Sequence, residues 1–287
     1  MKKVLILGST GMAGHVIYRY FEELGIYELY NLSHSYKLNE NTKILDVRKL
    51  DVFEKFLDEI KFDIIVNCIG LLNDFAERSP KDAILVNSYL PKFLEEKYLD
   101  SNTKIIHLST DCVFSGKQGS YSENSFKDGN TIYALTKSIG EIDNNKDLTI
   151  RTSIIGPDIN KNGIGLFNWF MKQSGNIKGY KNVIWTGITT IELAKAIQEF
   201  INQNITGIYH LIPKEKISKY ELLILLKSTF GKSEINIYED NQIISDKSLL
   251  NTRTDFNYMV HEYTEMLKHM KTWIEANKKN YDHYIYT

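Results

Sequence analysis

The chain has 287 residues, of which 43% are hydrophobic and 25% charged, enough to bury the core of one large domain or of two fused lobes. Its 35 lysines and arginines nearly balance 36 aspartates and glutamates, which disfavours nucleic acid or an anionic membrane surface as a partner. The apolar run at residues 4–7 is too short for a signal peptide, and no stretch is long enough to span a bilayer. We therefore expect a cytoplasmic protein that binds neither nucleic acid nor membrane. The two cysteines, Cys68 and Cys112, lack metal-like spacing and are expected to be reduced, buried thiols.

Predicted strands and helices alternate along the first half of the chain. The apolar run at 4–7 ends at a glycine, and residues 13–24 then carry apolar side chains at helical spacing. The same patterns predict, in chain order, a strand at 27–32, a helix at 49–60, strands at 63–69 and 105–108, a helix at 131–141 and a strand at 149–155. This order favours an α/β fold, a Rossmann-type doubly wound parallel sheet. The ligand crevice of such a sheet lies at the carboxyl ends of its strands.

The second half of the chain departs from this regular alternation. Residues 163–179 are richer in glycine, asparagine and aromatic residues, after which a helix at 191–201 and a strand at 208–212 are predicted. Further helices are predicted at 219–230 and 262–277. We interpret these segments as a smaller, interleaved C-terminal lobe. The Rossmann domain would comprise residues 1–155 and about 183–212, and the substrate lobe about 156–182 and 213–287.

A glycine-rich turn joins the first predicted strand to the first predicted helix. Its spacing is G-x-x-G-x-x-G, one residue different from the G-x-G-x-x-G of many dehydrogenases. Gly8 would make the tight turn, Gly11 would let a phosphate approach the helix N-terminus, and Gly14 would allow close packing of helix on strand. We predict that a dinucleotide binds against this turn, which consists of Gly8, Ser9, Thr10, Gly11, Met12, Ala13 and Gly14.

The end of the second predicted strand bears on the choice between NADH and NADPH. A carboxylate there would hydrogen-bond the ribose 2′-hydroxyl of NADH, but this strand runs into Ser33, His34, Ser35 and Lys37. Hydroxyls and a lysine favour a 2′-phosphate instead. We therefore predict NADPH as the cofactor, with NADH as the alternative, and expect these four residues to contact it.

Three further residues predict hydride chemistry at a carbonyl group. Tyr133 and Lys137 are four residues apart in a predicted helix, which places both side chains on one face. A nearby ammonium should lower the pKa of the phenol from its usual value of about 10 and make it a usable acid or base. Thr110 follows the strand at 105–108, at the edge where such sheets expose functional side chains. We predict that Thr110 polarises the carbonyl and Tyr133 supplies the proton, with no metal required.

With these motifs in place, the chain resembles the dTDP-4-dehydrorhamnose reductase family of extended short-chain dehydrogenases/reductases. The resemblance covers most of the chain, and its motifs occur in the family's order. The matching stretches are residues 8–14, Asp46-Val47, 67–70, Ala76-Glu77, Val86-Asn87 with Pro91, 109–116, Tyr133 with Lys137, Gly140-Glu141 and 151–153.

The resemblance implies NAD(P)H-dependent reduction of the 4-keto group of a nucleotide-activated 6-deoxyhexulose, in deoxysugar and surface polysaccharide biosynthesis. It places Asp46 and Val47 beside the adenine, and Ile69 and Gly70 beside the cofactor phosphates or ribose. Lys137 would bind the nicotinamide ribose, while Thr110 and Tyr133 would hold the reacting sugar oxygen. By the same resemblance, the remaining cofactor contacts are Cys68, Asn87 and Ser109, and the substrate contacts are Leu71, Asp111, Cys112 and Val113.

The C-terminal half offers weaker candidates for substrate binding, chiefly Asn162, Trp169 and Arg253. An arginine can hold a diphosphate through paired hydrogen bonds. None of the seven histidines is predicted to bind a metal, because we find no metal-like spacing with a carboxylate or another histidine. His107 lies in an apolar strand and is interpreted as structural. The apolar helix faces are compatible with a homodimer.

Departures from the family pattern leave the nucleotide and the sugar open. Residues 127–132 lack the proline common in the family, Ala134 replaces a glycine, and residues 185–194 differ from the usual run. A dehydratase is disfavoured, because Asp111 is followed by Cys112 rather than by the glutamate of that enzyme class.

Two alternatives remain. One is a sugar-nucleotide epimerase that retains its NAD, because the same Tyr/Lys pair serves oxidation and reduction alike. The other is a non-catalytic, nucleotide-binding regulatory subunit similar to the accessory subunits of methionine adenosyltransferase, since fold does not fix function. The intact Thr110, Tyr133 and Lys137 speak against the regulatory subunit.

Overall fold

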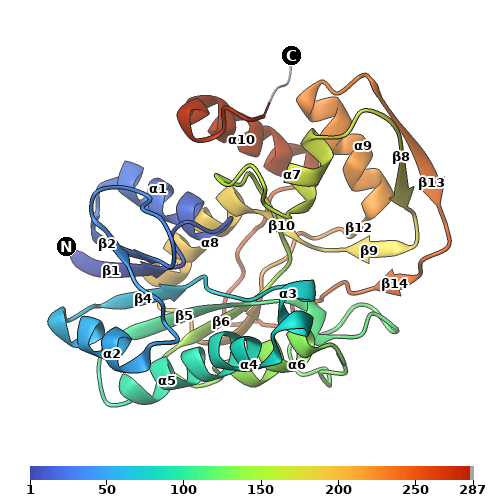
Figure 1. Cartoon of the computed structure of the whole chain (residues 1–287). Coiled ribbons are helices and arrows are strands. Elements are labelled where there is room, and N and C mark those ends of the chain that lie inside the picture. Colours follow the sequence, from blue (N-terminus) through green and yellow to red (C-terminus); the bar gives the residue numbers. More distant parts are fainter. Residues whose placement is uncertain (285–287) are drawn as a thin grey trace.

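A seven-stranded parallel sheet dominates the computed structural model, which describes residues 1–284 (Figure 1). The strand order is β11-β6-β5-β4-β1-β2-β3, and every pairing is parallel. The order reverses between β1 and β4, the point at which a doubly wound sheet opens its ligand crevice. The predicted Rossmann-type fold is therefore confirmed. The strands are β1 (Lys2–Leu7), β2 (Tyr27–Ser33), β3 (Thr42–Ile44), β4 (Ile64–Asn67), β5 (Lys104–Ser109), β6 (Leu148–Arg151) and β11 (Gly207–His210).

Both faces of this sheet are buried under helices (Figure 1). Side chains alternate across a strand, so Val4 and Ile6 enter one hydrophobic core whereas Leu5 and Leu7 enter the other. A sheet buried on both faces requires nearly continuous apolar strands, which is the pattern seen in the sequence. Helices α1 (Gly14–Leu24) and α8 (Thr190–Asn202) cover the first face, and α2 (Leu50–Glu59) and α5 (Leu90–Lys97) cover the second.

Smaller elements complete the fold beside the carboxyl ends of the strands (Figure 1). Three small sheets are formed by β7 (Ile154–Ile155) with β10 (Ile188–Thr189), by β9 (Val183–Trp185) with β12 (Ile217–Ser218) and β14 (Ser245–Asp246), and by β8 (Gly175–Tyr180) with β13 (Ile235–Asp240). The other helical segments are α3 (Asn73–Arg78), α4 (Pro80–Ala83), η1 (Ile84–Tyr89), η2 (Asp111–Val113), α6 (Ile132–Gly140), α7 (Leu166–Met171), α9 (Lys219–Phe230), α10 (Tyr263–Ala276) and η3 (Lys278–Asn280). None of the helices within residues 1–284 is long and apolar enough to cross a membrane.

One predicted element is wrong in its extent. The single strand expected at 149–155 is two strands, β6 and β7, which belong to different sheets. The chain leaves the main sheet after Arg151, whose side chain is held by buried partners, and the carbonyl of Ser153 then accepts a hydrogen bond from the backbone of Ile188 at 2.9 Å. The apolar residues on either side of this break made the segment resemble one continuous strand.

Candidate active site

The glycine turn after β1 is shaped by close contact between backbone segments. Gly8 has a φ of 79°, in the region that favours glycine. A Cβ atom at Gly14 would lie 2.2 Å from the carbonyl oxygen of Gly8, so only a glycine lets α1 approach the turn this closely. The N-cap residue of α1, Ala13, makes no side-chain capping bond. In the first turn, the N–H of His15 donates to the carbonyl of Gly11 at 3.1 Å, and the other N–H groups are left for an anion.

A cavity of about 320 Å³ opens in front of this turn, at the carboxyl ends of β1, β2, β3 and β4. Many of the residues predicted to contact a cofactor are therefore brought together from segments far apart in the sequence. Its lining consists of Gly8, Thr10, Gly11, Leu32, His34, Leu45, Asp46, Val47, Arg48, Cys68, Ile69, Gly70, Leu71, Asp82 and Val86.

Charged groups gather on one wall of this cavity. Arg48 lies 2.9 Å from a carboxylate oxygen of Asp46 and 2.9 Å from one of Asp82. Its guanidinium lowers the pKa of Asp46 to about 2. The imidazole Nε2 of His34 lies 3.6 Å from Asp46. The sequence analysis did not identify Arg48 as a cofactor contact, although it comes directly after Asp46-Val47.

Ser33, Ser35 and Lys37, which were also predicted to contact the cofactor, do not line this cavity. Lys37 is exposed and its ammonium lies 3.3 Å from Glu40, so it does not supply the positive charge of the cavity. The hydroxyl of Ser33 donates to the backbone carbonyl of Tyr36, and the hydroxyl of Ser35 lies 2.7 Å from His34 Nδ1. This corrects the expected basis for 2′-phosphate binding, because Arg48 and His34 occupy the place assigned to Lys37 and the two serines.

Asn87 shapes the loop after β4 instead of lining the cavity. Its side chain is fully buried, and its carbonyl oxygen accepts a 2.8 Å hydrogen bond from the backbone of Leu71. Its amide nitrogen donates to the carbonyl of Leu71 at 2.9 Å and to the hydroxyl of Thr136 at 3.1 Å. Asn87 thereby ties the cavity wall at Gly70-Leu71 to helix α6.

Tyr133 on α6 and Thr110 after β5 meet beside the loop that carries Leu71. Tyr133 packs in a small apolar cluster with Leu71, and only 8% of its surface is exposed. Burial raises the pKa of its phenol above the ordinary range, and a hydrogen bond with the side chain of Thr110 offsets this only in part. The prediction that this pKa is lowered is therefore wrong, because burial of the phenol dominates and the charges of Cys112 and Asp111 act in the same direction. The hydroxyl of Thr110 donates to Asp111 at 3.1 Å.

Lys137 is buried one helical turn after Tyr133 and faces the carboxyl end of β5. Its ammonium donates to the carbonyl of Leu108 at 2.7 Å and lies 3.1 Å from Nε2 of His107. Burial lowers the pKa of Lys137 to about 8. Burial raises the pKa of the Cys68 thiol, whereas the charge of Lys137 acts to lower it, so Lys137 lies close to a residue that lines the cavity. His107, interpreted from the sequence as structural, is thus a direct neighbour of the predicted catalytic lysine.

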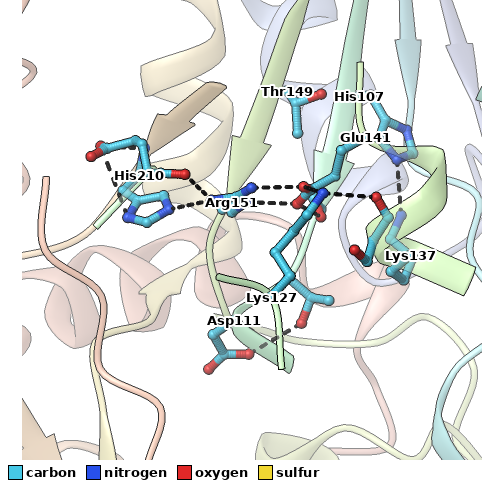
Figure 2. A network of polar contacts seen from close by, with 12 residues as sticks. His107, Asp111, Lys127, Lys137, Glu141, Thr149, Arg151 and His210 are labelled. Atoms are coloured by element: carbon cyan, nitrogen blue, oxygen red, sulfur yellow. Dashed lines mark hydrogen bonds and ion pairs between the residues drawn. The ribbon is translucent and has the colours of Figure 1, made fainter. Parts of the chain in front are cut away.

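A buried ion pair lies at the carboxyl ends of β5 and β6 (Figure 2). Glu141 accepts two hydrogen bonds from the guanidinium of Arg151, at 2.6 and 2.7 Å, and one from Lys127 at 3.0 Å. Burial alone would raise the pKa of Glu141, but Arg151 holds it below its ordinary value. Ser109 donates its hydroxyl to Glu141 at 2.7 Å. The side chain of Ser109, expected at the cofactor, is therefore directed into this network.

The ammonium of Lys219 lies near Asp111, on the side of the small sheets. The ammonium of Lys219, the first residue of α9, lies 4.2 Å from the ring centre of Trp185. Burial lowers the pKa of Lys219 to about 8, and the negative charge of Asp111 counteracts this. Cys112 is partly buried and Val113 fully buried in η2, directly after Thr110. Lys219 was missed because nothing in its local sequence points toward residues 110–113.

The weaker candidates lie farther from these residues or have other partners. The guanidinium of Arg253 donates to Asp255 at 2.8 Å and to the carbonyl of Ile208 at 3.2 Å, along the edge strand β11. The structure thus corrects the expectation that Arg253 holds a diphosphate. Asn162 is exposed, and Trp169 on α7 keeps 40% of its surface exposed.

Comparison with known proteins gives this arrangement a family. The model of the RmlD substrate binding domain family matches residues 1–270. Methionine adenosyltransferase 2 subunit beta of Xenopus tropicalis is 25% identical over 245 residues, which are 80% of this chain and 72% of that protein. dTDP-4-dehydrorhamnose reductase of Aggregatibacter actinomycetemcomitans is 30% identical over 143 residues, 49% of this chain and 46% of that protein.

A solved structure shares the fold closely. The dTDP-4-dehydrorhamnose reductase of Bacillus anthracis, in complex with NADP, superimposes with a TM-score of 0.81 at 21% identity, over 95% of this chain and 99% of that one. With the match of the family model over nearly the whole sequence, this chain belongs to the RmlD substrate binding domain family.

Proposed function

We propose that this chain is an NADPH-dependent reductase of the 4-keto group of a nucleotide-activated 6-deoxyhexulose. The observation that carries the proposal is that Thr110 and Tyr133 meet beside Leu71, which lines the cavity at the switch point of the sheet. Lys137, one helical turn after Tyr133, lies close to Cys68 of the same cavity lining. The dTDP-4-dehydrorhamnose reductases among the similar proteins support this reaction class. Deoxysugar synthesis for a surface polysaccharide would be its setting.

The residues around the cavity fit a nicotinamide dinucleotide. The glycine turn leaves no room for a Cβ at Gly14 and has free N–H groups at the start of α1, as a pyrophosphate site requires. Arg48 and His34 supply the positive charge suited to a 2′-phosphate, which supports NADPH over NADH. When bound, the reduced nicotinamide supplies the hydride.

The chain's own residues bind and protonate the carbonyl oxygen of the substrate. Thr110 donates a hydrogen bond to this oxygen and orients the keto group. Tyr133 gives its proton to the oxygen as the alcohol forms; its raised pKa keeps the phenol protonated at neutral pH, so the acid is ready. Lys137, as an ammonium, stabilises the phenolate that remains.

We assign substrate recognition to residues that lie near η2 and the start of α9. Lys219 lies near enough to Asp111 for the charge of that carboxylate to act on it, and its ammonium suits the diphosphate of a nucleotide sugar. Trp185 offers an apolar wall beneath its ammonium. We extend this to a division of labour in which residues 1–155 and about 183–212 bind the cofactor, and about 156–182 with 213–287 bind the sugar nucleotide.

A panel of 4-keto-6-deoxy sugar nucleotides tests the proposal. Consumption of NADPH is followed optically and products are identified by NMR. We expect stoichiometric oxidation of NADPH with at least one member of the panel. Interconversion of sugars with tightly held NAD and no net cofactor use would instead establish an epimerase.

A regulatory subunit is the second candidate, because the similar proteins include the beta subunit of methionine adenosyltransferase 2, matched over 80% of this chain. The test is co-purification with a methionine adenosyltransferase and its effect on that enzyme's kinetics. Cofactor binding without turnover on any keto-sugar, together with such a complex, would replace the reductase proposal.

A further inference from the structure

A carboxylate and two histidines converge where helices α8 and α10 meet, and none of them lines the cofactor cavity. Glu192 lies in the first turn of α8, His261 precedes α10, and His269 lies within α10. One possible ligand atom of each lies within 4.8 Å of the other two. Sequence spacing indicated no metal site at any histidine and could not reveal this group, because its carboxylate comes from a helix 69 residues before His261.

Glu192 is a buried acid without a basic partner of the usual kind. Its side chain is only 1% exposed, and its oxygens lie 3.0 and 3.1 Å from Nδ1 of His261. The Tyr258 hydroxyl donates to it at 3.3 Å. Among the ion pairs within residues 1–284, none joins Glu192 to a lysine or arginine. Because a buried carboxylate needs compensating positive charge, this site calls for a cation or a protonated imidazole.

The two histidines are oriented as metal ligands commonly are. Nδ1 of His269 is buried and has no hydrogen-bond partner among the described residues. The opposite ring nitrogens, Nε2 of His261 and of His269, lie 3.8 and 3.9 Å from the same carboxylate oxygen of Glu265. A carboxylate facing the far nitrogen of a metal-bound imidazole fixes the ring and its tautomer.

We propose that Glu192, His261 and His269 bind a divalent transition-metal ion, with zinc the best match to two imidazoles and a carboxylate. One oxygen of Glu192 and the two Nδ1 atoms supply three ligands, while Glu265 orients both rings. Water takes the fourth position from the surface hollow that His269 lines together with Lys195. Ligands of a tetrahedral zinc ion lie about 3.4 Å apart. Glu192 and His261, at 3.0 Å, are already near this separation, so the main movement would be of His269 toward them, because the widest separation in the group is within 4.8 Å.

The site would act as a clamp between α8 and α10. A metal that binds the native chain and not the unfolded one stabilises the fold in proportion to its occupancy. Lys195 opposes this binding, since its positive charge acts on His269. The inference does not depend on the proposed reductase activity.

The test uses the full chain, prepared without a histidine tag and stripped with EDTA. Titration with ZnCl2 in a calorimeter should give one ion per chain, and zinc should raise Tm saturably. His269→Gln should abolish both effects, whereas its Tm without metal should stay close to that of the parent, because Nδ1 of His269 has no partner to lose. Glu275→Gln, which alters an exposed carboxylate on the same helix, should keep both effects.

Two further variants should change the affinity for zinc in opposite directions. Glu265→Gln should weaken zinc binding by about 10- to 100-fold through loss of ring orientation. Lys195→Gln should strengthen zinc binding, because a repulsive charge is removed. Absence of stoichiometric zinc binding by the parent chain, or equal binding by His269→Gln, would overturn the proposal. Cobalt, read by the visible absorption of a tetrahedral site, gives an independent measure for the same variants.

Discussion

The cofactor side and the substrate side of the proposed active site are built in different ways. The cofactor side is centred on a contiguous turn, Gly8 to Gly14, whose shape follows from glycine geometry and strand order, although other segments complete the cavity wall. The substrate side is assembled from separate segments that contribute Thr110, Tyr133, Trp185 and Lys219. The comparison teaches that local backbone rules fix where a dinucleotide lies, whereas long-range packing fixes the charges that would act on a substrate.

The largest effect is expected when the proton donor on the substrate side is removed. Tyr133→Phe should lower kcat by about 10²- to 10⁴-fold, because general acid catalysis is lost, while the Kd for NADPH stays within about twofold. Steady-state kinetics and fluorescence titration measure the two quantities. Unchanged turnover would mean that the substrate side does not carry the chemistry.

Next in size is a change that closes the glycine turn. Gly14→Ala puts a Cβ atom 2.2 Å from the carbonyl oxygen of Gly8, a clash that should cost about 1–3 kcal/mol of folding free energy and weaken NADPH binding. Urea unfolding and cofactor titration are the measurements. Gly25→Ala is the control: it has a φ of 65° but no neighbouring atom within 4 Å, so it should lose stability and keep cofactor affinity. Equal affinities for both variants would contradict the assigned site.

The charged wall of the cavity sharpens the comparison further. Arg48→Gln should weaken NADPH binding about tenfold or more and leave NADH binding nearly unchanged, since hydrogen bonds to charged groups contribute roughly 1.5–3 kcal/mol. Lys37→Gln serves as the matched control, because Lys37 faces Glu40 on the surface. A larger effect at Lys37 than at Arg48 would restore the sequence-based assignment.

On the substrate side, Lys219→Met should raise KM for the nucleotide sugar about tenfold with little change in the Kd for NADPH. The reason is that Lys219 lies near Asp111 and outside the cofactor cavity. Lys214→Met, at an exposed lysine shortly before α9, should leave KM unaltered. A change in the Kd for NADPH without a change in KM for the nucleotide sugar would mean that Lys219 binds the cofactor and not the substrate.

The smallest effect is a pH dependence. Burial lowers the pKa of Lys137 to about 8, so the ammonium is present below this pH and is lost as the pH rises through it. Because kcat/KM for NADPH reports the free enzyme, it should fall by a few-fold above pH 8. The same fall should persist in Lys219→Met, which removes another lysine with a pKa of about 8. A profile that rises across this range would exclude the role given to Lys137.

The sequence by itself determined the sheet, the glycine turn and the identities of the three proposed catalytic residues. Strand and helix periodicity depends on local spacing, and the steric demand at Gly14 follows from its place between β1 and α1. The break between β6 and β7 was not predictable in this way, because apolar residues lie on both sides of the short polar run at 151–153.

Only the tertiary structure decided which charges face one another. It placed Arg48 on the cavity wall and Arg253 against an edge strand, and it gathered Glu192 with His261 and His269. It also reversed the expected pKa shift of Tyr133, because the phenol is buried by residues far apart in the sequence. Desolvation and pairing depend on distances between residues far apart in the chain, which local spacing does not contain.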